Sequence, residues 1–152
     1  MADPLPSPAQ TAADRLAFAE DDPSPLAVVN RFNQMAFFDR QPLEAMRRYL
    51  SEDFIERYPD FADDVDGHSD KNAAIAFFET RGWAEGEANK SVVYKVMAQD
   101  DEVMVFHHMT RGEGDRGLAF VDIFRVKDGL ITEHWAVGQP VSDKISPRHP
   151  MF

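Results

Sequence analysis

The sequence predicts an α+β domain in which three N-terminal helices pack on a strongly curved antiparallel sheet. In the first third of the chain, apolar residues recur at the spacing of a helix that buries one face. From residue 91 onward, runs rich in Val, Ile and Phe alternate with short turn sequences, which is typical of strands. Connections this short force neighbouring strands to be antiparallel, and helices followed by such a meander form an α+β fold.

Three segments before the sheet show helical patterning. Ser24-Pro25 suits the start of the first helix, Pro42 the start of the second, and Asp70 is expected to cap the third. Residues 53–58 are expected to form a short extended piece between the second and third helices. The apolar faces of these helices comprise Leu26, Val29, Phe32, Met35 and Ala36, then Leu43, Met46 and Leu50, then Ala74, Phe77 and Phe78.

The expected strands are four, and a turn signal separates each from the next. Asp100-Asp101 and Gly112-Glu113-Gly114 make the first two breaks. Lys127-Asp128-Gly129 reads as a three-residue hairpin loop, with Gly at the position that needs a positive φ. The strands cover residues 91–98, 102–111, 118–126 and 130–138.

The 152 residues fit one domain, and the composition narrows the function classes. A formal net charge of −11 disfavours a nucleic acid or an anionic membrane surface as partner. The absence of Cys excludes thiol chemistry, and no apolar run approaches a membrane-spanning helix, so we expect a cytoplasmic protein. We expect a disordered Pro/Ala-rich arm at 1–25, the folded domain at 26–142 and a tail at 143–152.

Asp122 is the most informative position. Its strand is apolar on both sides, and Asp122 shares one side with Phe120 and Phe124. A carboxylate buried there must find partners or stay protonated. We therefore expect Asp122 to have a raised pKa and to remain uncharged at neutral pH; the alternative is a structural Asp tied to Arg or to backbone groups.

Histidines on the flanking strands could join Asp122. His107 and His108 are adjacent, so one faces the interior and the other faces away. Consecutive strands could align His108, Asp122 and His134 in one row, which would supply an acid and a base for proton transfer. The same residues could instead form a buried hydrogen-bond network without turnover. Two histidines and a carboxylate could also bind a metal ion, but no supporting His spacing exists, so we expect none.

The segment DRGLAFVDIFRVKDGLITEHWAVGQP (115–140), and "DIFRVKDGLITEHW" within it, resembles the SnoaL-like polyketide cyclase family of the NTF2-like superfamily. The resemblance extends over about residues 26–140. It implies a cone-shaped α+β barrel, with a curved sheet wrapped around helices, a cavity at the open end and frequent homodimers. Homodimers through the sheet are therefore expected.

Several polar groups of these relatives are replaced in this chain. The "EHWDV" of the aldol-condensation enzymes is similar to Glu133–Val137, with Ala136 in place of the Asp. Their "HSH" is similar to Phe106-His107-His108, which keeps the second His, and their "QHNP" to Glu56-Arg57-Tyr58-Pro59. In the related ketosteroid isomerases, the oxyanion-hole Asp corresponds to Asp122, the general base falls near Tyr58-Pro59, and the Tyr donor falls near Phe32.

These features predict a cofactor-independent enzyme for a small apolar or carbonyl-containing molecule, with isomerisation, aldol-type cyclisation or dehydration as its chemistry. Asp122 would be the acid or hydrogen-bond donor, His108 or His134 the base and Tyr58 a second donor. The side chains expected to shape the pocket are Phe32, Phe106, Phe120, Phe124 and Trp135. The alternative is a non-catalytic binding or dimerisation module, with a narrow or plugged cavity and Asp122 neutralised by an Arg such as Arg57.

Overall fold

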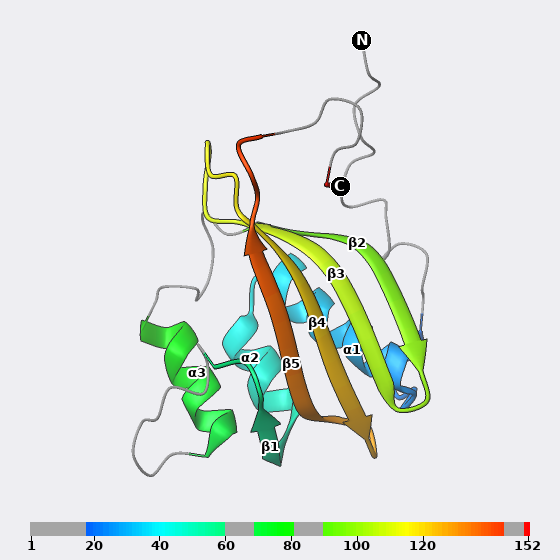
Figure 1. Cartoon of the computed structure of the whole chain (residues 1–152). Helices are drawn as coiled ribbons and strands as arrows, with labels where there is room; N and C mark the ends of the chain where they lie inside the picture. The colour runs from blue at the N-terminus through cyan, green and yellow to red at the C-terminus, as the bar shows by residue number, and fades with distance from the viewer. Residues whose placement is uncertain (1–17, 60–68, 81–89, 145–150) are drawn as a thin grey trace.

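The computed structural model describes residues 18–59, 69–80, 90–144 and 151–152. Helices are followed by a curved sheet, and the helices lie on one face of that sheet (Figure 1). The α+β prediction is therefore confirmed. The elements are α1 (Pro25–Asn33), a π-helical turn (Gln34–Phe38), α2 (Pro42–Tyr49), β1 (Leu50–Glu56), α3 (Asp70–Thr80), β2 (Lys90–Gln99), β3 (Glu102–Thr110), β4 (Leu118–Lys127) and β5 (Leu130–Pro140).

The sheet is mixed, with strand order β1-β5-β4-β3-β2. Strands β2 to β5 form the expected antiparallel meander, whereas β1 pairs in parallel with β5. The prediction of a wholly antiparallel sheet is wrong at this edge, because β1 reaches β5 only after α3 and three further strands. A connection of that length permits a parallel pair. Residues 1–17 of the predicted arm and 145–150 of the predicted tail lie outside the described residues.

Helix α1 begins as the sequence predicts and supplies much of the core. Ser24 is its N-cap residue and Pro25 its first residue, where the fixed φ of proline suits a helix. Val28 and Val29 are fully enclosed, and the ring of Phe32 meets Phe124 of β4 edge-on at 5.6 Å. These contacts hold α1 against the concave face of the sheet. No helix in the described ranges is long and apolar enough to cross a membrane.

Two local predictions are corrected. Ser69, not Asp70, caps α3, since the Ser69 hydroxyl accepts the Asn72 amide at 3.3 Å. The last hairpin has a two-residue loop, because Lys127 pairs with Leu130. Asp128 and Gly129 both have positive φ (52° and 77°), as a type I′ turn requires.

Cross-strand pairs determine which side chains share the concave face. Asp122 of β4 lies opposite Val105 of β3 and Ala136 of β5. Two residues after Asp122 in β4, Phe124 lies opposite His134 of β5. Two residues before Asp122, Phe120 lies opposite His107 of β3. Because side chains alternate between faces along each strand, all of these residues point toward the helices.

Candidate functional site

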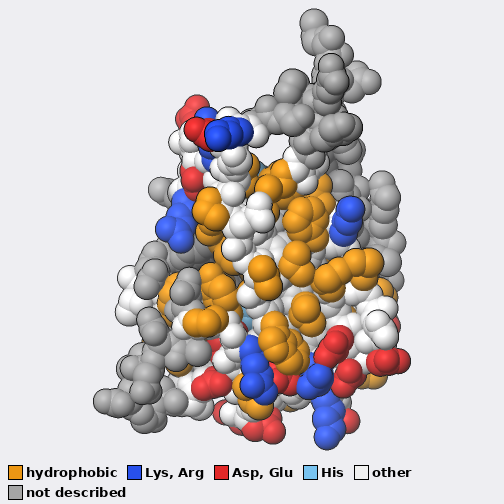
Figure 2. Space-filling view, viewed as in Figure 1, with side chains coloured by type: hydrophobic (Ala, Val, Ile, Leu, Met, Phe, Trp, Pro, Cys, Tyr) orange, Lys and Arg blue, Asp and Glu red, His pale blue; other side chains and the backbone are white. Residues whose placement is uncertain are grey.

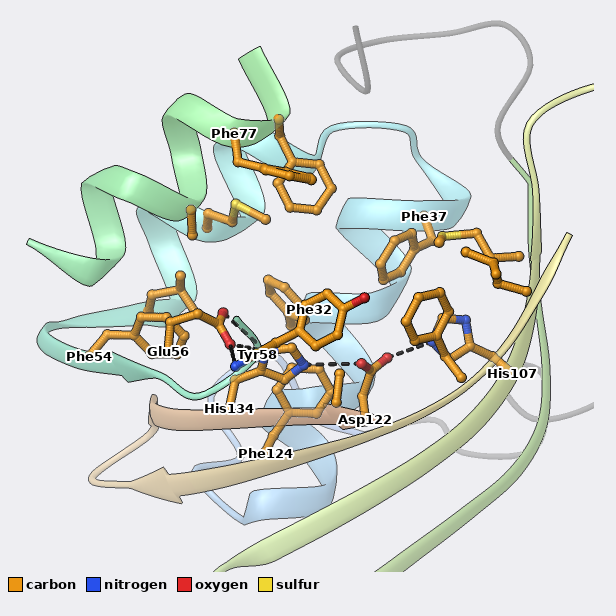
Figure 3. A pocket seen from close by; sticks show the side chains of 18 of the residues that line it. Phe32, Phe37, Phe54, Glu56, Tyr58, Phe77, His107, Asp122, Phe124 and His134 are labelled. Atoms are coloured by element: carbon orange, nitrogen blue, oxygen red, sulfur yellow. Dashed lines mark hydrogen bonds and ion pairs between the residues drawn. The ribbon is translucent and has the colours of Figure 1, made fainter. Parts of the chain in front are cut away.

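A pocket of about 140 Å³ lies between the helices and the concave face of the sheet. Its walls are mostly aromatic and aliphatic, with a small cluster of titratable groups on one side (Figure 3). Such a pocket is the usual form of a small-molecule site. The lining residues are Phe32, Phe37, Met46, Leu50, Phe54, Glu56, Tyr58, Ala74, Phe77, Phe78, His107, Met109, Arg111, Leu118, Phe120, Asp122, Phe124, His134 and Ala136.

The ring of Phe120 is accommodated because its partner on β5 is a glycine. A Cβ atom on Gly138 would lie 2.5 Å from Cε1 of Phe120, which is closer than van der Waals contact allows. Phe120 also meets Tyr58 edge-on at 6.0 Å and stacks on His107 at 5.7 Å between centroids. The backbone of β5 thus lets three side chains pack together at one wall of the pocket.

A continuous chain of hydrogen bonds crosses the pocket wall from β1 to β2. Nδ1 of His134 lies 2.8 Å from Oε1 of Glu56, and its Nε2 lies 3.0 Å from Oδ1 of Asp122. On the other side of Asp122, Oδ2 lies 2.5 Å from Nε2 of His107. Nδ1 of His107 lies 2.8 Å from the hydroxyl of Ser91. Figure 3 shows the run from Glu56 to His107 as one line of contacts.

Glu56 is fixed at its end of this chain. In the parallel pair, Glu56 lies opposite His134, and its backbone amide donates to Oδ2 of Asp70 at 2.9 Å. Its side chain is 2% exposed, and Oε1 also accepts the Tyr58 amide at 2.9 Å. Glu56 therefore links the imidazole of His134 to the backbone at Tyr58, whose hydroxyl points into the pocket (Figure 3).

Asp122 is ionised in this arrangement, contrary to the prediction. Burial would raise the pKa of its carboxyl, but the nearby charge of His107 and hydrogen bonds from both histidines outweigh burial and hold that pKa well below its usual range. The sequence indicated a polar group among aromatic rings but not the imidazoles on either side of it. Because a carboxylate only accepts, Nε2 of both histidines must carry the proton.

His134 is a cation at neutral pH. Burial disfavours its charged form, but hydrogen bonds to Asp122 and Glu56, together with their negative charges, raise its pKa to about 9. Both ring nitrogens face carboxylate oxygens, so each N–H is donated. The expected role of His134 as a base is therefore excluded in this state, because its ring is already protonated.

Six of the nine predicted site residues line the pocket. Asp122 and His134 belong to the hydrogen-bonded chain, and Tyr58 lies beside it. Phe32, Phe120 and Phe124 form apolar wall, and the Phe124 ring stacks on the His134 imidazole at 4.9 Å between centroids.

The other three predicted residues lie on the convex face of the sheet, so their assignment to the pocket is wrong. His108 bonds to the Arg116 carbonyl at 2.6 Å, and both His108 and Phe106 stack on Phe152. Trp135 lies 5.2 Å beneath the guanidinium of Arg125. Successive side chains along a strand point to opposite faces of the sheet. Phe106, His108 and Trp135 therefore point away from the face that carries Asp122 and His134.

His107 and Glu56 are the residues that the sequence reasoning missed. His107 shares its parity with Val103 and Val105, both buried, but the other side of the strand also looked apolar. Glu56 follows Phe54 at a spacing of two in β1, so a polar residue stands on an apolar side, as at Asp122. That pattern was the available signal for Glu56.

The partner predicted for Asp122 in the non-catalytic alternative is not observed. Arg57 binds Glu133, with Nε 2.6 Å from Oε1, and Glu133 also binds Arg125 at 2.6 Å. Across the part of the chain that the structure describes, no group of three or more His, Asp or Glu side chains is arranged to hold a metal ion.

Residues 29–134 match the model of the SnoaL-like domain family. The chain belongs to that family. No curated protein matches the chain.

Solved structures of the NTF2-like type share the fold. IdmH from Streptomyces antibioticus, described as a proposed polyketide cyclase, has a TM-score of 0.58 at 18% identity, over 76% of this chain and 91% of IdmH. A proposed ketosteroid isomerase from Kribbella flavida has a TM-score of 0.59 at 18% identity, over 82% of this chain and 84% of its own. An NTF2-like protein of unknown function from Mesorhizobium loti has a TM-score of 0.59 at 17% identity, over 82% and 99%. These likenesses confirm the predicted NTF2-like fold.

Proposed function

We propose that this SnoaL-like domain binds a small carbonyl compound in its pocket and moves a proton at the carbon next to the carbonyl. The observation that carries the proposal is the Asp122 carboxylate, which lies at the wall of an apolar pocket between two imidazole N–H donors. Isomerisation, aldol-type cyclisation and dehydration all begin with this kind of proton removal. Two structural relatives, described as a proposed polyketide cyclase and a proposed ketosteroid isomerase, are compatible with it.

The ionisation states support a division of roles. Asp122 is the general base, because its carboxylate can accept a proton while the protonated His134 cannot. Removal of the α-proton leaves its electron pair on the substrate as an enolate, whose oxygen would be stabilised by the Tyr58 hydroxyl. Asp122 then returns the proton, either to another carbon, which isomerises the substrate, or to a departing hydroxyl, which dehydrates it.

Glu56 supports this transfer from behind His134. When Asp122 takes up a proton, its negative charge disappears, and His134 would be left as an uncompensated buried cation. Glu56 bonds to the opposite nitrogen of the ring and keeps that charge balanced. Apolar walls exclude water when a ligand is bound, which makes the carboxylate a stronger base than in the empty pocket.

Deuterium exchange tests the proposal without knowledge of the natural substrate. The protein is incubated with 2-decanone in D₂O, and loss of the α-proton signals is followed by NMR. Wild type should accelerate exchange over buffer, and Asp122→Asn should lower the rate by roughly 10²–10⁴-fold, the usual contribution of a positioned base. Asp53→Asn, which changes an exposed Asp of β1, is the matched control and should leave the rate unchanged.

Exchange at the wild-type rate in Asp122→Asn contradicts the assignment of the base. Binding of 2-decanone by wild type without any exchange above buffer contradicts catalysis and favours the non-catalytic binding module. Ligand-observed line broadening, measured on the same samples, reports binding separately from exchange.

Exposed hydrophobic side chains on the convex face of the sheet favour a homodimer that forms through this face. Hydrophobic side chains gather over the sheet in Figure 2. Val137 of β5 lies two residues after Trp135, on the same side of the strand, and is 73% exposed. The Phe152 ring stacks on Tyr94, Phe106 and His108 and so covers the β2–β3 side. The β4–β5 side is the part of this face that a second copy of the chain would bury.

A further inference from the structure

One residue that lines the pocket takes no part in the chain of hydrogen bonds that runs from Glu56 through His134, Asp122 and His107 to Ser91. Arg111 follows β3 at the same parity as His107 and Met109, and its side chain lines the pocket. It is the one Lys or Arg among the lining residues that the structure describes. An exposed cation at the edge of an otherwise apolar pocket is a candidate determinant of which ligands enter.

Asp115 lies beside Arg111: hydrogen bonds from the backbone amides of Arg111 and Gly117, with a smaller contribution from the charge of the Arg111 side chain, lower the pKa of the Asp115 carboxyl. The Arg111 amide donates to Oδ2 of Asp115 at 2.7 Å, and Oδ1 of Asp115 accepts the Gly117 amide at 2.9 Å. Among residues 18–59, 69–80, 90–144 and 151–152, no side chain forms an ion pair with Arg111. A guanidinium presents five N–H donors in a fork that suits a carboxylate.

The sheet register separates Arg111 from Asp122 along the concave face. Asp122 lies opposite Val105, six residues before Arg111 along β3. At about 3.4 Å per residue, that is roughly 20 Å between the two Cα positions, a gap that the side chains of Arg111 and Asp122 shorten by about half when both extend toward a ligand. The concave face between them carries His107 with Phe120, then Met109 with Leu118, and it is therefore largely apolar.

We propose that Arg111 selects ligands that carry an anionic group, so that the substrate class of the site is an elongated keto acid. The carboxylate of the ligand pairs with Arg111 at the pocket edge, its apolar middle lies along Met109, Leu118 and Phe120, and its carbonyl reaches Asp122. This inference rests on the proposed function for the carbonyl end only. In a chain with a net charge of −11, a cation at the pocket edge also reduces the repulsion that an anionic ligand meets there.

Two matched probes test the inference. 9-Oxodecanoate and 2-decanone share a methyl ketone and the same chain length, and they differ in a terminal carboxylate against a methyl group. Dissociation constants are measured by NMR titration for wild type, Arg111→Gln and Arg116→Gln. Arg116 is the matched control, because it is an exposed Arg of the same loop whose side chain does not line the pocket.

Wild type should bind 9-oxodecanoate more tightly than 2-decanone, and Arg111→Gln should weaken 9-oxodecanoate about tenfold, in line with a charge-assisted pair that is partly exposed. The affinity for 2-decanone should not change, and Arg116→Gln should alter neither. The inference is overturned if Arg111→Gln binds 9-oxodecanoate as wild type does, or if Arg116→Gln loses as much affinity.

The two proposals fail in different ways. Loss of 9-oxodecanoate affinity in Arg111→Gln, without α-proton exchange in wild type, supports the anion site and contradicts the proton-transfer function. Exchange of 2-decanone with no preference for the keto acid contradicts the anion site alone. If neither probe binds to wild type, both proposals are wrong.

Discussion

The two faces of the sheet use the same kinds of side chain in opposite ways, and the adjacent residues His107 and His108 show the contrast. On the concave face, His107 is 4% exposed and lies between Ser91 and Asp122. On the convex face, His108 is partly exposed, bonds to a backbone carbonyl and stacks on Phe152 at 4.5 Å. Of the two imidazoles, only that of His107 lies beside both a carboxylate and the pocket, so the proposed proton transfer involves His107 and not His108.

Charged groups show the same difference. On the convex face, Arg125 bonds to Glu102 and Glu133 and covers the ring of Trp135. That network is open to solvent on its Arg side, so water and salt screen it. On the concave face, Asp122, His134 and Glu56 are shielded from water, and their interactions shift ionisation strongly. We therefore assign the proposed proton chemistry to the concave face.

The largest expected effect comes from replacing each of the two histidines in a separate variant. His107→Gln should reduce α-proton exchange of 2-decanone by at least about 10²-fold, because Asp122 loses the N–H donor that orients it. His108→Gln should leave exchange within about twofold of wild type, since His108 lies on the other face. NMR-detected exchange rates measure both. Equal losses in the two variants would contradict the division between faces.

A smaller effect is expected in the way the free energy of unfolding depends on pH. The pKa of His134 is raised from 6.5 to about 9, so the stability that it contributes is complete below about pH 6.5 and is lost as pH rises through about 9. This shift corresponds to a fall in the free energy of unfolding on the order of 3 kcal/mol across that range. Urea denaturation of wild type at several pH values measures it.

The His134→Gln variant is the control for this pH dependence. It should be less stable than wild type near neutral pH, but its free energy of unfolding should change little between about pH 6.5 and about pH 9. A slope equal to that of wild type would mean that another group causes the dependence.

The smallest effect concerns the convex face. Val137→Asp places a charge on the exposed β4–β5 surface and should weaken a homodimer at least about tenfold, as measured by sedimentation equilibrium. Leu130→Asp is a control of similar chemistry at the hairpin end of β5, where Leu130 is 38% exposed. Unchanged dimerisation in Val137→Asp, or a wild type that stays monomeric, contradicts the proposed dimer.

The fold was predictable because local patterns determine most of it. Strand bounds follow from runs of β-branched and aromatic residues between turn signals, and all four meander strands lie within two residues of their predicted ends. The parallel pairing of β1 was not predictable, because it depends on a contact between residues such as Glu56 and His134 that are 78 positions apart.

The site was predictable only in part, because partners decide both orientation and charge. Asp122 among Phe120 and Phe124 indicated a polar group on an apolar side, and Asp122 lines the pocket together with both rings. The choice of His108 over His107 failed because both sides of β3 are apolar, and nothing local distinguishes them. The shift of the Asp122 pKa was predicted in the wrong direction, since its two imidazole partners come from other strands.

The most direct test measures the protonation of Asp122 and His134 by NMR, from the side-chain carboxyl ¹³C shift of Asp122 and the imidazole ¹⁵N shifts of His134. We expect an Asp122 carboxylate that stays ionised from neutral pH down through the usual range for aspartate. We also expect a His134 ring that keeps both protons until the pH approaches about 9. A protonated Asp122 at neutral pH, or a His134 that titrates near 6.5, would contradict these expectations.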